Sequence, residues 1–268
     1  MASSATISKH WSKPPLIKNR LIRWLVWTGI PLYLILAFGS MDINWGRVIE
    51  GIGRGGDFLM SFSQPDFITH WSDISAGIVE SIVMAVTSTI VGVLISLPVA
   101  LGAARNLAPL PIYIFCRGII SVSRALQEII VAILMVAIFG FGPFAGFITL
   151  AFATIGFLAK LLAERIEDIN ESQSEAIRAT GASWPQWIIF GIYPQVLPRL
   201  IGLSMYRLDI NFRESAILGI VGAGGIGATL NTAFDRYEFD TAAAIILIII
   251  ALVLMAEYAS SWLRIKVQ

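Results

Sequence analysis

Charged residues are scarce in this 268-residue sequence, and their scarcity argues against a soluble protein. Asp, Glu, Lys and Arg make up 14% of the chain, whereas soluble proteins average about 25%. Hydrophobic residues account for 56%, so lipid rather than water is expected to cover much of the exterior. The formal net charge of +1 gives no support for a nucleic-acid partner. The composition therefore predicts a protein embedded in a lipid bilayer.

The sequence also lacks the residue patterns that most catalytic and metal sites need. Cys116 is the single cysteine, so neither an intrachain disulfide nor a thiolate metal site can form. His10 and His70 are isolated and show no metal-ligand spacing. No G-x4-G-K-[ST] motif occurs, so ATP hydrolysis is not expected in this chain. We therefore expect no enzyme activity, no metal site and no cofactor here.

Long apolar stretches are present instead, and they predict an all-α polytopic membrane protein. A helix needs about 20 apolar residues to cross a hydrocarbon core of about 30 Å. Gly140 to Pro143 predicts a tight turn between two such stretches. The expected spans are roughly 21–40, 77–104, 117–139, 144–163, 199–221 and 241–262. This gives one membrane domain over 21–268 with about six helices, or five if the third or fifth segment is re-entrant.

The distribution of basic residues predicts the orientation. Lys and Arg concentrate in residues 1–23 and again in 160–199, which lie on one side of the membrane if spans alternate. By the positive-inside rule both termini are then cytoplasmic, and residues 1–20 form a cytoplasmic N-terminal segment. The first apolar run is longer than a typical signal peptide's, so an uncleaved anchor is the better interpretation.

The longest predicted cytoplasmic loop, about 164–198, contains a short helix–turn–helix pattern. Ser172-Gln-Ser-Glu175 matches a capping box and predicts a helix that starts near Ser172. Gly181 permits a turn into a second short helix that carries Trp184. This shape suits docking in a groove of another protein, although an ordinary amphipathic surface helix is the alternative.

This loop resembles the signature of binding-protein-dependent ABC importer permeases, E-A-A-x3-G followed by nine residues and I-x-L-P. Glu175, Ala176, Gly181 and Pro194 match it, whereas Ile177, Gly191 and Tyr193 depart from it. In that family the loop inserts into a cytoplasmic ATPase. The resemblance therefore implies that ATP and Mg²⁺ bind to a partner chain. The implied coupling residues are Glu175, Ala176, Gly181, Trp184 and Pro194.

Further blocks resemble permeases of the phosphonate/phosphite import family from Ser81 onward. They are Arg124 to Glu128, Gly140 to Gly146, Gly156 to Glu164, Tyr206-Arg207, Arg213 and Val221 to Gly227. This resemblance implies the type I importer permease fold, shared with methionine-importer permeases, in the bacterial inner membrane. It also implies three partners: a cytoplasmic ABC ATPase dimer, an extracytoplasmic substrate-binding protein and a second permease copy in a homodimer.

The glycine block at 222–227 matches G-x-G-x-x-G, the fingerprint of dinucleotide-binding folds. That fingerprint needs a βαβ unit, but an apolar run suited to a membrane span follows. Close helix crossing, or a broken backbone that lines a cavity, is the better interpretation. The glycines concerned are Gly222, Gly224, Gly225 and Gly227.

Charges inside predicted spans are costly and often mark function. The spacing predicts i,i+4 pairs for Arg124–Glu128, Asp209–Arg213 and Lys160–Glu164. The arginines could line a path for an anion, or the pairs could simply fix helix packing, which we favour for Lys160–Glu164. The candidate pathway or gate residues, with the glycines above, are Arg124, Glu128, Arg207, Arg213 and Glu214.

The sequence thus predicts the permease subunit of an ATP-driven importer for a phosphonate, phosphite or related oxyanion. Methionine or phosphate is the alternative cargo. A stand-alone secondary transporter or channel is a rival class, but no internal repeat supports it. A membrane enzyme is disfavoured because no acid–base or metal constellation is present.

Overall fold

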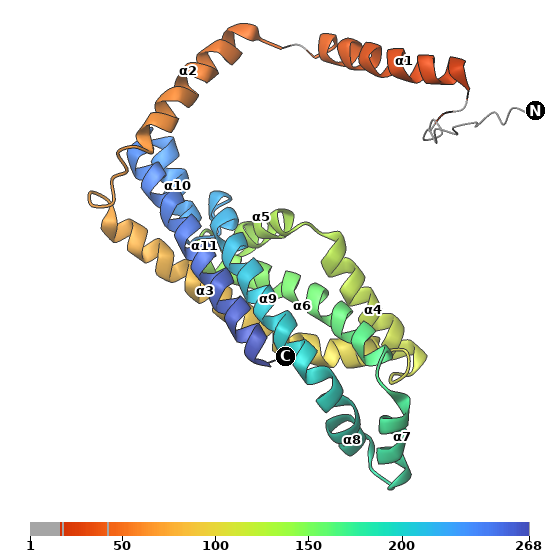
Figure 1. Ribbon diagram of the computed structural model, residues 1–268. Coiled ribbons are helices and arrows are strands. Elements are labelled where there is room, and N and C mark those ends of the chain that lie inside the picture. The colour runs from red at the N-terminus through yellow and green to blue at the C-terminus, as the bar shows by residue number, and fades with distance from the viewer. Residues whose placement is uncertain (1–16, 18, 42, 268) are drawn as a thin grey trace, which may run out of the picture. The chain divides into compact units, whose positions relative to one another are not determined.

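The computed structural model describes residues 17, 19–41 and 43–267, and every regular element among them is a helix (Figure 1). The predicted all-α class is confirmed. The predicted N-terminal segment 1–20 lies almost entirely outside the described residues. The helices are α1 (Arg20–Gly39), α2 (Trp45–Ser61), α3 (Trp71–Ala103), α4 (Leu110–Ala125), α5 (Glu128–Phe139), α6 (Pro143–Glu167), α7 (Glu171–Ala179), α8 (Trp184–Trp187), the π-helix η1 (Ile188–Ile192), α9 (Tyr193–Ile220), α10 (Ile226–Asp235) and α11 (Phe239–Val267).

The chain divides into two compact units, Met1–Gly56 and Asp57–Gln268. In the first unit, α1 is an apolar helix of 20 residues in which no side chain is buried. At 1.5 Å per residue it is long enough to cross a hydrocarbon core of about 30 Å. The unit ends inside α2, whose remaining residues belong to the second unit.

Among the described residues, five helical stretches are long and apolar enough to cross a membrane: α1, α3, α6, the run Trp184–Ile220 and most of α11. The count is six if α4 and α5, which meet at 94°, form one broken span. The expected third span, 117–139, is interrupted by this bend, and the helix before the bend begins earlier than expected, at Leu110. Leu126 and Gln127 have extended backbones that end α4 and restart the chain as α5.

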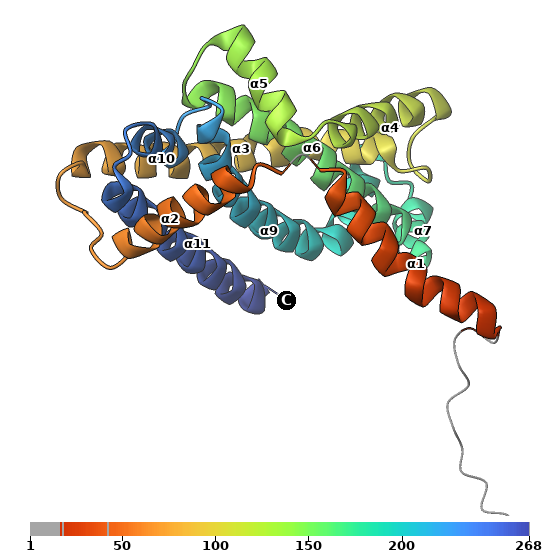
Figure 2. The ribbon, with the colours of Figure 1, turned by 90° about the horizontal axis from the view of Figure 1, so that it is seen from above.

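Helix α6 packs against α3, α4, α5 and α9 and forms the centre of the second unit (Figure 2). Small residues allow these close approaches: a Cβ on Gly92 would overlap Thr154, and one on Gly156 would overlap Ser123. Large apolar side chains such as Leu94, Phe115 and Leu254 are exposed on the outside. An apolar exterior around a core of small residues suits a helix bundle in lipid.

The second unit has two distinct ends, which lie far apart in Figure 1. Helices α7 and α8 project from one end, beyond α6 and α9. Helix α10 and the beginnings of α3 and α11 lie at the other end. The coupling residues predicted from the sequence lie at the α7–α8 end.

Candidate functional site

Residues 170–192, here called the docking hairpin, comprise α7, α8 and η1. The expected capping box Ser172–Glu175 is wrong: α7 is capped two residues earlier, where Asn170 Oδ1 accepts hydrogen bonds from the Ser172 N–H at 3.1 Å and hydroxyl at 2.7 Å. Asparagine and serine are equally favourable N-cap residues, and Asn170 is the one nearer to the end of α6. A capping box is present instead at α8, where the Ser183 N–H donates to Gln186 Oε1 at 2.9 Å.

Gly181 makes the turn between α7 and α8. Its φ is +80°, and an added Cβ would meet nothing within 4 Å. Backbone conformation rather than space therefore favours glycine here, since L-residues are strained at positive φ. Glu175, Ala176 and Trp184 lie on either side of this turn and are exposed. The hairpin presents these side chains at its tip, while Pro194 is exposed at its base, in the first turn of α9.

Trp187 holds the hairpin together from inside. It is buried, and its Nε1 donates a hydrogen bond to the buried Ser174 Oγ at 2.7 Å. The Arg178 guanidinium lies over the indole ring, 4.3 Å from its centroid. α7 and α8 are thus fixed to each other by one hydrogen bond and one cation–π contact.

The hairpin joins the membrane bundle without a loop on its α9 side. α8 passes directly into η1 and then into α9, so the run Trp184–Ile220 is helical throughout. Gln195, in the first turn of α9, donates to the Gly191 carbonyl at 2.7 Å and accepts from the Asn170 N–H at 3.0 Å. The hairpin and α9 are therefore joined by one helical run and by the hydrogen bonds of Gln195.

The second group of candidate residues surrounds the break between α4 and α5. The expected Arg124–Glu128 pair on one helix face is wrong, because the two residues lie on different helices. Glu128 instead pairs with Arg207 of α9, with Oε1 and Nη2 2.8 Å apart. Arg207 is 3% exposed, and its Nε also donates to Thr154 Oγ1 at 3.0 Å. This ion pair joins the broken span to α6 and α9.

One turn further along α9, Asn211 continues the buried polar contacts. It is fully buried, and its Nδ2 donates to Thr89 Oγ1 at 2.8 Å and to Thr154 Oγ1 at 3.0 Å. We call Glu128, Thr154, Arg207, Asn211 and Thr89 the polar ladder. It connects α5, α6, α9 and α3 through the interior of the bundle, where unpaired polar groups are costly.

An open hollow of about 260 Å³ lies beside the ladder. Arg124 is exposed there, whereas Arg207 is engaged with Glu128 and Thr154. Guanidinium groups give charge-assisted hydrogen bonds to anion oxygens. The hollow is lined by Ser123, Arg124, Leu126, Gln127, Glu128, Ala153, Phe157 and Arg207.

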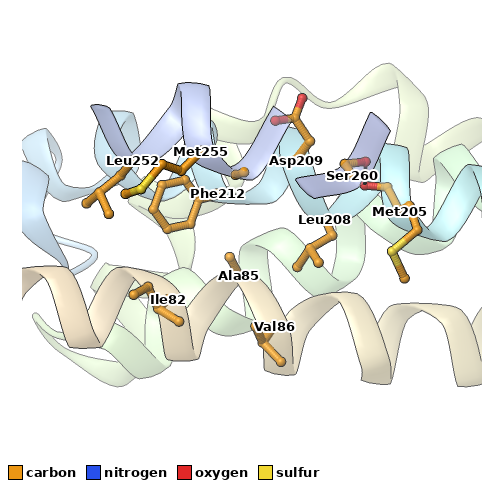
Figure 3. Close-up of a pocket in the computed structure, with 11 residues that line it drawn as sticks. Ile82, Ala85, Val86, Met205, Leu208, Asp209, Phe212, Leu252, Met255 and Ser260 are labelled. Atoms are coloured by element: carbon orange, nitrogen blue, oxygen red, sulfur yellow. Dashed lines mark hydrogen bonds between the residues drawn. The ribbon is translucent and has the colours of Figure 1, made fainter. Parts of the chain in front are cut away.

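The predicted Asp209–Arg213 pair is confirmed, with a distance of 3.2 Å between Oδ2 and Nη2. Asp209 borders an apolar groove between α3, α9 and α11 that Figure 3 shows, and its carboxylate points away from α3. Its Oδ1 is buried and has no hydrogen-bond partner among the described residues. Arg213 is half exposed, and Glu214 lies close to Glu128, Arg207 and Arg213. Lys160–Glu164 is also confirmed, at 3.7 Å on the surface.

The glycine block forms a broken backbone between α9 and α10. Gly222, Gly224 and Gly225 all have φ near +80°. Helix packing is also close here, because a Cβ on Gly227 would overlap the carbonyl of Ala216. Glu80 Oε2 accepts a hydrogen bond from the Gly225 N–H at 2.9 Å, which fixes the loop to α3.

Sequence reasoning missed Thr89, Thr154 and Asn211 as members of one network, and missed Glu80. A single carboxylate inside the apolar run 77–104 was a signal that could have identified Glu80. Nothing in the sequence marked the two threonines, since threonine is common in apolar helices. Asn211 follows Arg207 by four residues on α9, and both are buried.

The fold and these sites define a multi-pass membrane protein with a projecting hairpin and charged residues inside its bundle. Residues 96–267 match the family model of the binding-protein-dependent transport system inner membrane component. The chain belongs to this family of membrane transport proteins.

Several curated relatives cover most of the chain. It is 39% identical over 231 residues to the phosphate-import permease protein PhnE of Mycolicibacterium smegmatis, which is 86% of this chain but only 43% of that protein. It is 37% identical to the phosphite transport system permease protein PtxC of Stutzerimonas stutzeri, over 88% of this chain and 85% of that protein. The putative phosphite permease HtxC of the same organism is 34% identical over 86% and 82%.

Among solved structures, a chain of the inward-facing MetNI methionine ABC transporter superposes with a TM-score of 0.65. The sequence identity is 24%, and the match covers 73% of this chain and 96% of that one. This similarity confirms the predicted methionine-importer-like fold.

Proposed function

We propose that this chain is the permease subunit of an ATP-driven importer for a phosphonate, phosphite or related phosphorus oxyanion. The observation that carries the proposal is its similarity, along 86–88% of its length, to two phosphite transport permeases. The arginine-containing hollow beside the polar ladder supports an anionic cargo, because guanidinium groups bind oxyanions through charge-assisted hydrogen bonds.

In this proposal ATP and Mg²⁺ bind to a separate cytoplasmic ATPase dimer. The docking hairpin would contact it through Glu175, Ala176, Gly181 and Trp184, with Pro194 at the base of α9. The continuous helix from α8 through η1 to α9 supports this role, since movement of the hairpin would shift Arg207 and Arg213. Both termini would then be cytoplasmic, with residues 1–20 ahead of a transmembrane domain over 21–268.

The proposed complex contains two copies of this chain, with an extracytoplasmic binding protein delivering the anion at the α10 end. Arg124, Glu128, Arg207, Arg213 and Glu214 would then line the path or its gate. The glycine loop, with Gly222, Gly224, Gly225 and Gly227, would contribute a backbone constriction. Alternating access would release the anion inside the cell.

Phosphate is the second candidate cargo, because the M. smegmatis relative carries the name of a phosphate-import permease. Methionine is supported by weaker likenesses, to the solved methionine transporter and to two probable D-methionine transport permeases that are 29% and 25% identical to this chain. Both alternatives would use the same type of transporter with a different substrate-binding protein.

ATPase stimulation in proteoliposomes tests the proposal. The chain is reconstituted with its ATPase and binding protein, and the binding protein is loaded in turn with phosphite, methylphosphonate, phosphate or methionine. Stimulation by phosphite or methylphosphonate is expected. Stimulation by methionine alone would contradict the proposed oxyanion cargo. Anion transport without the ATPase would contradict the proposed ATP-driven mechanism.

A further inference from the structure

Helix α2 carries an apolar stripe along its length. Its large apolar side chains recur at the i, i+3, i+4, i+7 spacing of one helix face, whereas charged residues occupy the other side. All of the stripe residues are exposed, most of them by about two thirds. The stripe consists of Trp45, Val48, Ile49, Ile52, Leu59 and Met60, with glycines at the intervening positions 55 and 56.

Both ends of α2 are connected to membrane-spanning helices. Five residues separate Trp45 from Gly39, the last residue of α1, and five extended residues reach less than about 20 Å. Near its other end, the Phe58 ring lies 5.8 Å from Phe234 and 5.9 Å from Phe239, the first residue of α11. α2 therefore begins and ends near the level at which spans leave the bilayer.

The helix would be weak without a surface to cover its stripe. Five of its 17 residues are glycines, and glycine is the poorest helix former after proline. Among the described residues, Gly51, Gly53, Gly55 and Gly56 have no neighbour within 4 Å of an added Cβ, so no close contact there requires glycine. Apolar contact along the stripe would supply the stabilisation that the backbone lacks.

The charges on α2 indicate which kind of surface this is. Arg47 and Arg54 are balanced by Glu50 and Asp57, so the helix has no net charge. A zwitterionic lipid surface suits such a helix, and Trp45 is a residue type enriched at membrane interfaces. A strongly charged protein partner would be expected to face charges of one sign.

We propose that α2 lies in the membrane interface at the α10 end of the spans, with its stripe against the lipid. The lipid surface is then the partner of the apolar stripe of α2. Since both ends of α2 connect to spans, this contact would hold the α1–α3 connection close to the bilayer. The inference does not depend on which anion is carried.

Site-directed spin labelling of the full chain in zwitterionic nanodiscs tests this proposal. In a Cys116→Ala background, single cysteines replace Ile49 and Ile52 on the stripe, and Glu50 and Arg54 on the polar side. Collision rates with oxygen, which concentrates in lipid, and with a water-soluble nickel chelate are then compared. The oxygen-to-nickel ratio is expected to be severalfold higher at the two stripe positions.

Two outcomes would overturn the proposal. Equal ratios at all four positions would place α2 in water, and protection of the stripe from both reagents would identify a protein as the occupant. A second variant, Ile52→Glu, tests the apolar contact itself, with the spin label kept at position 49. It should raise nickel accessibility at position 49 severalfold, while Glu50→Gln should leave it unchanged.

Discussion

The polar ladder and the docking hairpin hold their helices together by different kinds of contact. The ladder buries an ion pair and an amide inside the bundle, with Arg207 at 3% exposure and Asn211 fully buried. The hairpin uses a glycine turn, neutral caps and one tryptophan hydrogen bond, and it leaves its charged tip in water. Damage to the ladder should therefore unfold the bundle, whereas damage to the hairpin should leave a folded protein that cannot couple.

The largest expected effect comes from Arg207→Ala. This change leaves Glu128 without its partner inside the bundle, and removing one member of a buried ion pair costs about 3–5 kcal/mol. The yield of monodisperse protein and its thermal unfolding temperature in detergent should both fall sharply. The double variant Arg207→Ala/Glu128→Ala should recover part of the loss, and failure to recover any would show that the pair is not the main contribution.

Gly181→Val tests the hairpin side of the comparison. A non-glycine residue at φ +80° costs about 1–2 kcal/mol, which corresponds to about a tenfold loss of affinity for a partner that needs this turn. ATPase stimulation should fall by about that factor while the unfolding temperature stays unchanged. Gly118→Ala is the matched control, because Gly118 is an exposed glycine inside α4 with open space around it. A loss of global stability in Gly181→Val would contradict the division between the two regions.

Trp187→Phe should have a smaller effect. It keeps an aromatic ring but removes the hydrogen bond to Ser174 Oγ, a loss of about 1 kcal/mol. The affinity of the chain for its ATPase should weaken severalfold. Ser174→Ala removes the same bond from the other side, so the two changes should not be additive. Full additivity would mean that the bond contributes nothing.

Lys160→Gln should have the smallest effect. Lys160 and Glu164 lie 3.7 Å apart and are both partly exposed, and such surface pairs contribute about 0–1 kcal/mol. Unfolding temperature and ATPase stimulation should both stay close to those of the unchanged protein. A decrease comparable to that of Arg207→Ala would show that this pair is functional and would place it with the ladder.

Hydropathy alone was enough to predict the spans, because each uninterrupted apolar run needs only length to be recognised. It could not reveal the break at Leu126 and Gln127, since the apolar content of 117–139 stays high on both sides of it. The sequence also could not predict that Glu128 pairs with Arg207. The i,i+4 spacing predicted Arg124 as its partner. Because the helix breaks before Glu128, the two residues lie on different helices, and Glu128 pairs with Arg207, which is distant in the sequence. Likewise, the N-cap of α7 is Asn170 and not the predicted Ser172.

The broken span has a consequence for biosynthesis. α4 has 16 residues and α5 has 12, so each is shorter than the roughly 20 residues that a single crossing requires. If they form one broken span, the two halves enter the bilayer as one unit, with Arg124 and Glu128 near their junction. Arg207 follows Glu128 by 79 positions in the chain. The Glu128 carboxylate can therefore form this ion pair only after α9 has been synthesised. Completion of this membrane bundle is thus coupled to translation of its later half.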